Sequence, residues 1–524
     1  MKMTADSLPN DPELLKQMVL SMQQDMAGLQ QDKAHLQQSL SAEKSRTERL
    51  ELRLAALLRN RFGRSSERSQ STDQLDLMIE DVETALAEIS PNLKTSAKTS
   101  STSRSRKPFS KSLPREERRY EPASCNCPDC GGEMKRIGED TSEMLHVVPE
   151  QYVVIQQIRT KYGCSGCDKI AQAPAQERVI DKGIASAALI AQVIVDKYAD
   201  HLPLYRQEER FKRADIDLDR STLAGWVGRA GALLAPLVEA IRTHVMAADK
   251  VHADDTTAPT LKPGNNKTLT GRYWNYVRDD RPWGGNAAPA VWFQYSTTRS
   301  GKEPAAHLKG YRGIIQADAY AGYNLAVQSG VTRAGCWAHV RRKFFELAES
   351  TQSPVAQEAV DRINALYQVE KRINGLPPDE RQRYRQQHAK PLMEDLHNWL
   401  DRTLRLCSKR SELGKVINYA RKQWESLTLY LDDGRVEIDN NAAERAIRPL
   451  ALGRKNHLFA GSEDGGHYGA ALYSIMGTAK LNGMDPKAYL TAVLKRINNT
   501  KTSDVNNLLP WNIDLNDSQV AEAI

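Results

Sequence analysis

The chain has 524 residues, which is enough for three or four folding units and at least one large hydrophobic core. Its 73 lysines and arginines are nearly balanced by 66 acids, so the net charge is only +7 and the distribution of charge matters more than its total. The N-terminus lacks an apolar signal core and no apolar run approaches the ~20 residues of a membrane span, so we expect a cytoplasmic protein that does not enter a membrane.

Residues 10–68 carry a heptad pattern of apolar residues. One core position, interrupted only by Glu43, holds Leu15, Met22, Leu29, Leu36, Leu50 and Leu57. The other, interrupted at Lys33 and Thr47, holds Val19, Met26, Leu40 and Leu54. The pattern predicts a coiled coil and therefore a dimer or a higher homo-oligomer. A single amphipathic helix packed on its own chain is the alternative.

Residues 69–118 read as a flexible linker. Its central part, residues 92–112, is rich in lysine, arginine, serine and threonine and contains no acid. This composition cannot bury a core, and its charge suits a non-specific DNA tether. A solubilising spacer is an equally good interpretation.

Residues 119–178 contain two CxxC pairs in a chain with only seven cysteines, which favours metal binding over disulfides. We expect a closed, structural Zn²⁺ site whose ligands are Cys127, Cys130, Cys164 and Cys167. Cys125 could compete with Cys127 as a ligand. Between the pairs, the alternation of residues 144–164 predicts a β-hairpin.

Residues 182–247 look helical throughout. We expect helices over residues 184–200, 203–213 and 221–241, the last capped by Ser221. A helix pair with exposed basic residues resembles a helix-turn-helix, so the candidate DNA-binding residues are Arg206, Arg210, Lys212 and Arg213. Ordinary core packing of the same helices is the alternative.

Residues 248–470 change to strands. Three apolar runs, residues 250–261, 271–280 and 290–299, predict antiparallel strands, and a helix is expected at 303–311. Strands at 313–320 and 332–340 and a helix at 341–350 follow. This order predicts a ribonuclease-H-like α/β domain, so the whole chain would be multidomain α+β.

A charged helical region at residues 354–430 reads as an insertion into that domain, serving as a solvated scaffold or contacting DNA or a second protomer. Residues 471–524 form a C-terminal segment with two helices separated at Asn482 and Gly483. Beyond Asn499 we expect a loosely ordered end that docks through Leu508, Leu509 and Trp511.

Three carboxylates in this domain stand in positions suited to catalysis. Asp254 and Asp318 end apolar runs. Glu444 lies on a predicted helix that has Asn440, Asn441 and Arg448 on the same face. Two acids from strands and one from a helix can hold the pair of divalent metal ions that in-line attack on a phosphodiester requires. Each acid alone could instead belong to a turn, or to a capping box with Asn441 at the cap.

The chain resembles the large transposases of the insertion-sequence 66 family, a branch of the DDE transposases. The resemblance runs over nearly the full length and is carried by RNRFGRSSER, LPRE, CPDCGG with CSGC, LPLYRQEERF, HADDT, GYRGIIQADAYAGYN, GCWAHVRRKFFE, DNNAAERAIRPLALGRKNHLFAGS and ALYSIMGTAKLNGMDPKAYL. It implies that Asp254, Asp318 and Glu444 are the catalytic acids. The family often has glutamate where this chain has Asp255, and because adjacent strand residues face opposite ways, either aspartate could point at the metal.

The resemblance implies a bacterial, nucleoid-associated enzyme that binds the terminal inverted repeats of its element, cuts them and joins them to target DNA. Its cofactors would be Mg²⁺ or Mn²⁺ at the acids and structural Zn²⁺, and small accessory proteins of the same element are possible partners. We expect Arg448, Arg454 and Lys455 at phosphates and Asn441 orienting Glu444 or the substrate. His339 is a candidate DNA contact, although a core or helix-capping role suits it better.

Two other functions fit parts of the pattern. One is a DNA-binding regulator derived from a transposase, against which the three intact acids argue. The other is a ribonuclease-H-like nuclease that cuts without joining, against which the long modular N-terminus argues.

Overall fold

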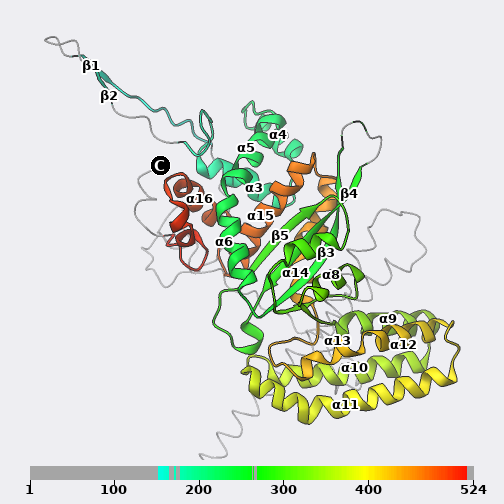
Figure 1. The fold of residues 1–524 in the computed structure, drawn as a ribbon. Coiled ribbons are helices and arrows are strands. Elements are labelled where there is room, and N and C mark those ends of the chain that lie inside the picture. Colours follow the sequence, from blue (N-terminus) through cyan, green and yellow to red (C-terminus); the bar gives the residue numbers. More distant parts are fainter. Residues whose placement is uncertain (1–151, 164–169, 173–177, 263, 265–267, 516–524) are drawn as a thin grey trace, which may run out of the picture. The chain divides into compact units, whose positions relative to one another are not determined.

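The computed structural model describes residues 152–163, 170–172, 178–262, 264 and 268–515 (Figure 1). The predicted coiled coil, the basic linker and the four cysteines predicted to bind zinc lie outside these residues. Contacts divide the chain into a small unit, Leu93–Gln176, and a large unit that holds the remaining residues.

In the small unit, the described residues form a short antiparallel hairpin. Strands β1 (Lys161–Gly163) and β2 (Ile170–Gln172) pair with Gly163 opposite Ile170. The second CxxC pair falls at residues 164–167, between the two strands in sequence and outside the described residues. A β-hairpin was expected at residues 144–164, of which the structure describes 152–163. Residues 152–160 form no strand, and β1 pairs with β2, which lies beyond the expected hairpin, so this prediction is wrong for the described residues.

The large unit begins with four helices. They are α3 (Ala187–Tyr198), α4 (Leu204–Arg213), α5 (Arg220–Leu233) and α6 (Ala235–Met246). The prediction of a single helix at 221–241, capped by Ser221, is wrong. The structure has two helices there: α5 begins at Arg220 after the N-cap Asp219, and the chain breaks at Leu234 before α6 begins. Pro236 explains the break, since proline lacks the N–H that would continue the hydrogen-bond ladder.

No single helix in the described part is both long and apolar enough to span a bilayer. The helices α5 and α6 would be long and apolar enough only as a pair, and they are bent by 50° relative to each other.

A five-stranded mixed sheet forms the centre of the large unit. Its strands are β3 (Lys250–Thr260), β4 (Leu269–Arg278), β5 (Ala290–Ser296), β6 (Ile314–Gln316) and β7 (Thr332–Ala334). The spatial order is β5-β4-β3-β6-β7, with β3, β4 and β5 antiparallel and β6 and β7 parallel to β3. Three antiparallel strands followed by two parallel ones agree with the predicted order.

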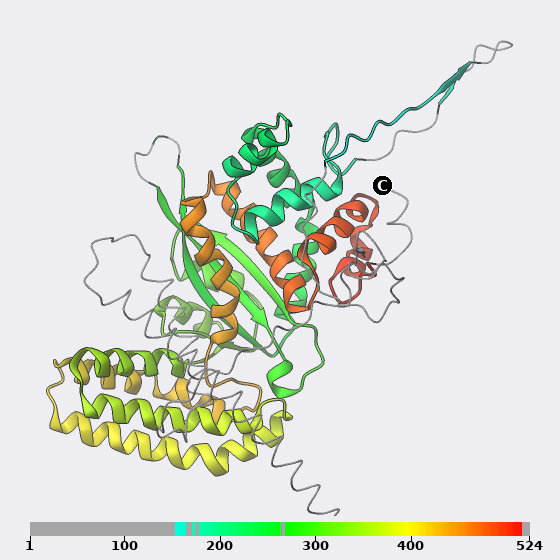
Figure 2. The same ribbon diagram turned by 180° about the vertical axis from the view of Figure 1, so that it is seen from behind.

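Helices cover both faces and one edge of the sheet. One face carries α14 (Asn441–His457), which lies across β3 and β4 (Figure 2). The other carries the short helices α7 (Lys302–His307), η3 (Ala321–Tyr323) and α8 (Asn324–Gln328). At the edge, α15 (Glu463–Leu481) packs on β5, where Ser474 and Thr478 accept N–H bonds from Phe293 and Val291.

The region between β7 and α14 is a separate helical layer with its own apolar core (Figure 1). It contains α9 (Trp337–Thr351), α10 (Pro354–Ile373), α11 (Pro378–Leu406), α12 (Glu412–Lys422) and α13 (Trp424–Thr428). The predicted strand at 332–340 is too long, because it ends at Ala334 and α9 already begins at Trp337.

The end of the chain packs on the first helices of the large unit. Helix α16 (Pro486–Arg496) contacts α3 and is followed by the 3-10 helix η6 (Thr502–Leu508). Leu508 and Leu509 are buried, and the Trp511 ring lies 4.4 Å from the His244 ring, centroid to centroid. The predicted docking through these residues is confirmed, but the described segment up to residue 515 is folded rather than loosely ordered.

Candidate active site

Three neighbouring strands, β3, β6 and β7, bring Asp254, Asp318 and Cys336 to equivalent positions. His252 of β3 pairs with Gln316 of β6, and Gln316 pairs with Ala334 of β7. Two residues beyond each of these positions come Asp254, Asp318 and Cys336. Because adjacent strands lie about 4.8 Å apart, this register sets the three residues in neighbouring positions where β6 and β7 end, while β3 continues to Thr260.

The buried Tyr323 hydroxyl lies within electrostatic range of Asp318, Asp255 and Asp254. Burial raises the pKa of Tyr323 well above its usual range, and Tyr276 and then these three aspartates raise it further. Tyr323 belongs to η3, directly after the loop that carries Asp318, so this loop and β3 approach each other.

The strand register distinguishes Asp254 from Asp255. Asp254 pairs with Asn275, whose amide donates to the Ala443 carbonyl of α14 over 2.8 Å, so Asp254 faces α14. Asp255 pairs with Trp274 on the opposite face.

On that face Asp255 is held by two arginines. Its side chain is 2% exposed and forms ion pairs with Arg272 at 3.0 Å and Arg299 at 2.9 Å. Burial raises the pKa of Asp255, against the opposing effect of both arginines. Asp255 is thus occupied by structural ion pairs, which leaves Asp254 on the face of the third acid.

Glu444 comes from the first turn of α14 and is 3% exposed. The start of this helix is fixed by Asn440, whose Nδ2 donates to the Ala253 carbonyl over 2.8 Å and whose Oδ1 lies 3.1 Å from His252 Nδ1. Lys250 Nζ lies 3.0 Å from His252 Nε2 and can only donate while charged. The His252 proton is therefore on Nδ1 and points at Asn440.

Burial, assisted by the Lys250 charge, lowers the pKa of His252 to about 3, so the ring is neutral at physiological pH. This chain of bonds connects β3 directly to the first residue before α14. The alternative explanation of Glu444, a capping box with Asn441 at the cap, is wrong. The N-cap of α14 is Asn440, which makes no side-chain cap bond, and Asn441 Nδ2 donates to Asp439 over 3.1 Å.

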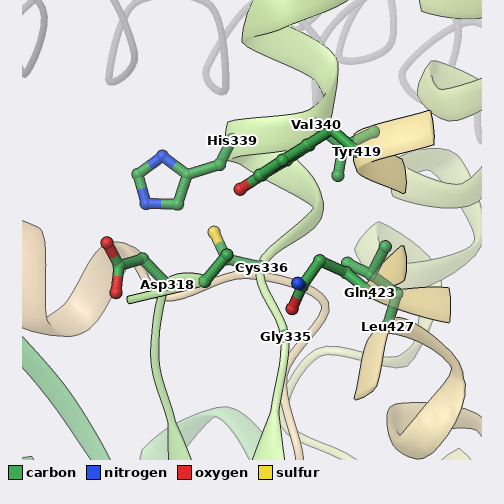
Figure 3. A pocket seen from close by; sticks show the side chains of 9 residues that line it. Asp318, Gly335, Cys336, His339, Val340, Tyr419, Gln423 and Leu427 are labelled. Atoms are coloured by element: carbon green, nitrogen blue, oxygen red, sulfur yellow. The ribbon is translucent and has the colours of Figure 1, made fainter. Parts of the chain in front are cut away.

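Cys336 and His339 add a thiol and an imidazole to the site. Cys336 is the N-cap residue of α9 and accepts the Asn440 N–H at its sulfur over 3.3 Å. His339 Nε2 lies 3.5 Å from Glu444 Oε1. Both residues line a pocket with Asp318, and Figure 3 shows the carboxylate, the thiol and the ring facing the same space.

Sequence reasoning missed Cys336 because it placed residue 336 inside a strand. The signal was present as Cys-x-x-His at the true start of α9, where residues three apart share a helix face. His252 was also missed, and Asn440 was expected beside Glu444 but not as the residue that holds the start of α14 against β3.

The acids provide only oxygen donors, which is the donor type that Mg²⁺ and Mn²⁺ prefer. Asn441 offers one more: its Oδ1 is buried and has no hydrogen-bond partner among the described residues. The chemistry of these donors therefore suits a hard divalent ion, whereas the close group of donor atoms found among the described residues joins Glu444 to Cys336 and His339 and not to the two aspartates.

The basic residues of α14 differ in their surroundings. Arg454 donates to the Thr257 carbonyl over 3.0 Å and to the Thr257 hydroxyl, which fastens the helix to β3. Lys455 is exposed and Arg448 is half-buried.

The candidate DNA-binding residues of α4 lie apart from these acids. Arg206, Lys212 and Arg213 are exposed, whereas Arg210 forms an ion pair with Asp196 of α3 at 2.9 Å. The connection from α4 to α5 spans residues 214–219 and includes Asp215 with φ of 59°. It is longer than the three or four residues usual in a helix-turn-helix.

Acids from β3 and from the loop after β6 lie near α14, whose Lys455 is exposed, and comparisons with known proteins identify the class of protein as a transposase. The family model described as "Transposase IS66 family" matches residues 182–468. Further matches are the "zinc-finger binding domain of transposase IS66" at 124–168, "Transposase C of IS166 homeodomain" at 49–118 and the "IS66 C-terminal element" at 474–511. The chain belongs to the IS66 family of transposases, and the resemblance seen in its sequence is confirmed.

Three relatives from Sinorhizobium fredii (strain NBRC 101917 / NGR234) match over most of their length. "Uncharacterized protein y4hP" is 41% identical over 88% of this chain and 88% of its own. "Uncharacterized protein y4qI" is 38% identical over 96% and 97%, and "Uncharacterized protein y4jD" is 40% identical over 77% and 81%.

Proposed function

We propose that this chain is the DDE transposase of a bacterial insertion sequence, which cuts the ends of its element and transfers them to target DNA. The observation that carries the proposal is the parallel register of β3 and β6, in which Asp254 and Asp318 each come two residues after the paired His252 and Gln316. Glu444 comes from a helix on the face to which Asp254 points. The strand order supports a ribonuclease-H-like core for this domain.

In this proposal Asp254, Asp318 and Glu444 hold divalent ions, Mg²⁺ or Mn²⁺. Bound there, the ions would supply activation of the attacking oxygen and stabilisation of the leaving oxygen of the phosphodiester. The chain itself contributes the placement of the acids. His252 and Asn440 hold the start of α14, and Arg454 holds its end, so that Glu444 is kept over β3.

The basic side chains are proposed to bind DNA rather than react with it. Arg448 and Lys455 follow Glu444 along α14 and would contact phosphates near the cut, with Asn441 orienting the glutamate or the substrate. His339, a quarter exposed and 3.5 Å from Glu444, would contact the DNA beside the scissile bond. Arg206, Lys212 and Arg213 of α4 would bind the terminal repeats at a distance from the acids.

The N-terminal regions are proposed to organise the DNA ends. The match to the zinc-finger domain supports structural Zn²⁺ at Cys127, Cys130, Cys164 and Cys167. The family match at residues 49–118, a leucine-zipper-like domain, supports a homo-oligomer that could hold two DNA ends together. We further propose that the protein works at the bacterial nucleoid and that small accessory proteins of the element take part.

A reaction with purified protein, Mg²⁺, labelled element ends and supercoiled target plasmid distinguishes the functions. A transposase gives end-specific nicks and a joined product. Nicks without joining would show a nuclease. Binding without any nick, also after the accessory proteins of the element are added, would show a regulator. The Glu444→Gln variant should bind the ends but give neither product.

A further inference from the structure

Three different donor atoms converge at the edge of the candidate active site. The Cys336 sulfur, a His339 ring nitrogen and a Glu444 carboxylate oxygen all lie within 4.8 Å of one another. Cys336 and Glu444 are 4% and 3% exposed, while the His339 side chain is 25% exposed and opens the group to solvent. Figure 3 shows the thiol directed toward the imidazole.

This donor set is unsuited to the ion proposed for catalysis. Mg²⁺ takes oxygen ligands almost exclusively, whereas sulfur and nitrogen with one carboxylate suit Zn²⁺. A tetrahedral zinc ion with bonds of about 2.0–2.3 Å needs ligand atoms roughly 3.5 Å apart. Side-chain movements of about an ångström would therefore bring the three atoms to that spacing, with a fourth position left to water.

The surroundings of Cys336 favour an anionic sulfur ligand. Cys336 is the N-cap of the 15-residue helix α9, and its sulfur accepts the N–H of Asn440, the N-cap of the 17-residue helix α14. The positive ends of two helix dipoles thus lie at the thiol. A backbone N–H to the ligand sulfur is also the kind of outer-shell bond that orients metal ligands.

We propose that Cys336, His339 and Glu444 form a second divalent-metal site, selective for a soft ion such as Zn²⁺, whose occupation withdraws Glu444 from Asp254 and Asp318 and inhibits strand cleavage. The inhibitory role rests on the proposed function of Glu444, whereas the binding site itself does not. Zinc would act here as a regulator and would be distinct from the structural ion proposed for the four N-terminal cysteines.

Zinc binding tests the site without reference to activity. The full-length protein is dialysed against buffered Zn²⁺ under reducing conditions, and bound zinc per chain is measured for wild type, Cys336→Ser and His339→Ala. Cys407→Ser is the matched control, since Cys407 is the other cysteine that the described residues place outside a disulfide. We expect wild type and the control to bind an additional zinc ion that both site variants lack. Equal zinc content in all four proteins would overturn the proposal.

Inhibition tests the regulatory role. With Mg²⁺ fixed and each protein normalised to its own activity without zinc, Cys336→Ser should need at least about tenfold more Zn²⁺ than wild type for half-inhibition. The Cys407→Ser control should behave as wild type. Equal inhibition of wild type and Cys336→Ser would overturn the regulatory role. Additional zinc in a wild-type protein that cuts no DNA with Mg²⁺ would overturn the proposed function and the inhibition, and would support the metal site alone.

Discussion

At the scale of single residues, two adjacent aspartates of β3 have opposite surroundings. Asp254 faces α14 through its pairing with Asn275, and Asp255 is enclosed by Arg272 and Arg299. The first suits metal binding and the second suits structural ion pairing. The sequence identified the pair but could not choose between them, because the choice depends on which residue of β4 stands opposite and which helix that residue contacts.

The two aspartates should therefore respond differently to the same substitution. Asp255→Asn leaves two arginines facing an uncharged amide, and we expect the free energy of unfolding to fall by about 3 kcal/mol. Asp254→Asn removes a carboxylate from a group of acids and should change stability by less than about 1 kcal/mol, while abolishing cleavage. Urea denaturation of both variants measures the difference. The reverse order of stabilities would contradict the assignment of the two faces.

At the scale of elements, a network of buried charges connects the sheet to the helical layer. Glu437, just before α14, lies 3.7 Å from Lys250 of β3 and 3.2 Å from Arg381 of α11. Arg381 and Arg385, both nearly inaccessible to solvent, also pair with Glu370 of α10 at 3.4 and 2.6 Å. Lys250 in turn contacts His252, so the helical layer is coupled to the residues that hold Asn440.

This network should make stability depend on pH through Glu437. Burial opposes its ionisation, but Lys250 and Arg381 outweigh burial and lower the pKa of Glu437 to about 2, against about 4.3 in an unfolded chain. The carboxylate thus stabilises the fold above about pH 4.5, and this contribution disappears as the pH falls toward 2.

Glu437→Gln removes that contribution, so wild type should exceed the variant by about 3 kcal/mol of unfolding free energy near neutral pH. The difference should shrink as the pH falls through about 4. Denaturant unfolding at a series of pH values measures it. A difference that stays constant over this range would show that Glu437 is not held ionised by its partners.

Element types were easier to predict than element boundaries. The three antiparallel strands and the long helices follow from apolar periodicity over many residues. The break between α5 and α6 depends on Pro236, and the short strand β7 depends on pairing with β6, which no local pattern contains. The same error at β7 hid Cys336, because a helix start was read as a strand.

The predicted zinc site belongs to the element scale as well. Cys130→Ser or Cys164→Ser should release the structural ion and unfold the predicted zinc-binding domain at residues 119–178, since such sites supply folding free energy. Zinc analysis of each purified variant, with Cys407→Ser as the control, tests this. Unchanged zinc in both variants would rule out the four-cysteine assignment.

At the scale of the whole molecule, family matches extend from the zipper-like segment at 49–118 to the C-terminal element at 474–511. The match at 49–118 overlaps the end of the predicted coiled coil, residues 10–68, and covers the predicted linker, residues 69–118. Within the large unit, the helical layer from α9 to α13 separates Asp318 from Glu444 in sequence. After this layer the chain returns to the sheet through α14. The acids could be predicted individually, but their approach depends on this return and on the Asn440 contacts to β3.

The central claim is that Asp254, Asp318 and Glu444 together make the site of strand cleavage. The most direct measurement compares Mg²⁺-dependent cleavage of labelled element ends by wild type, Asp254→Asn, Asp318→Asn and Glu444→Gln, with end binding measured on the same preparations. We predict that wild type cuts and that each variant binds the ends nearly as well but cuts none. Full cleavage by any one of the three variants would remove that residue from the site and contradict the account.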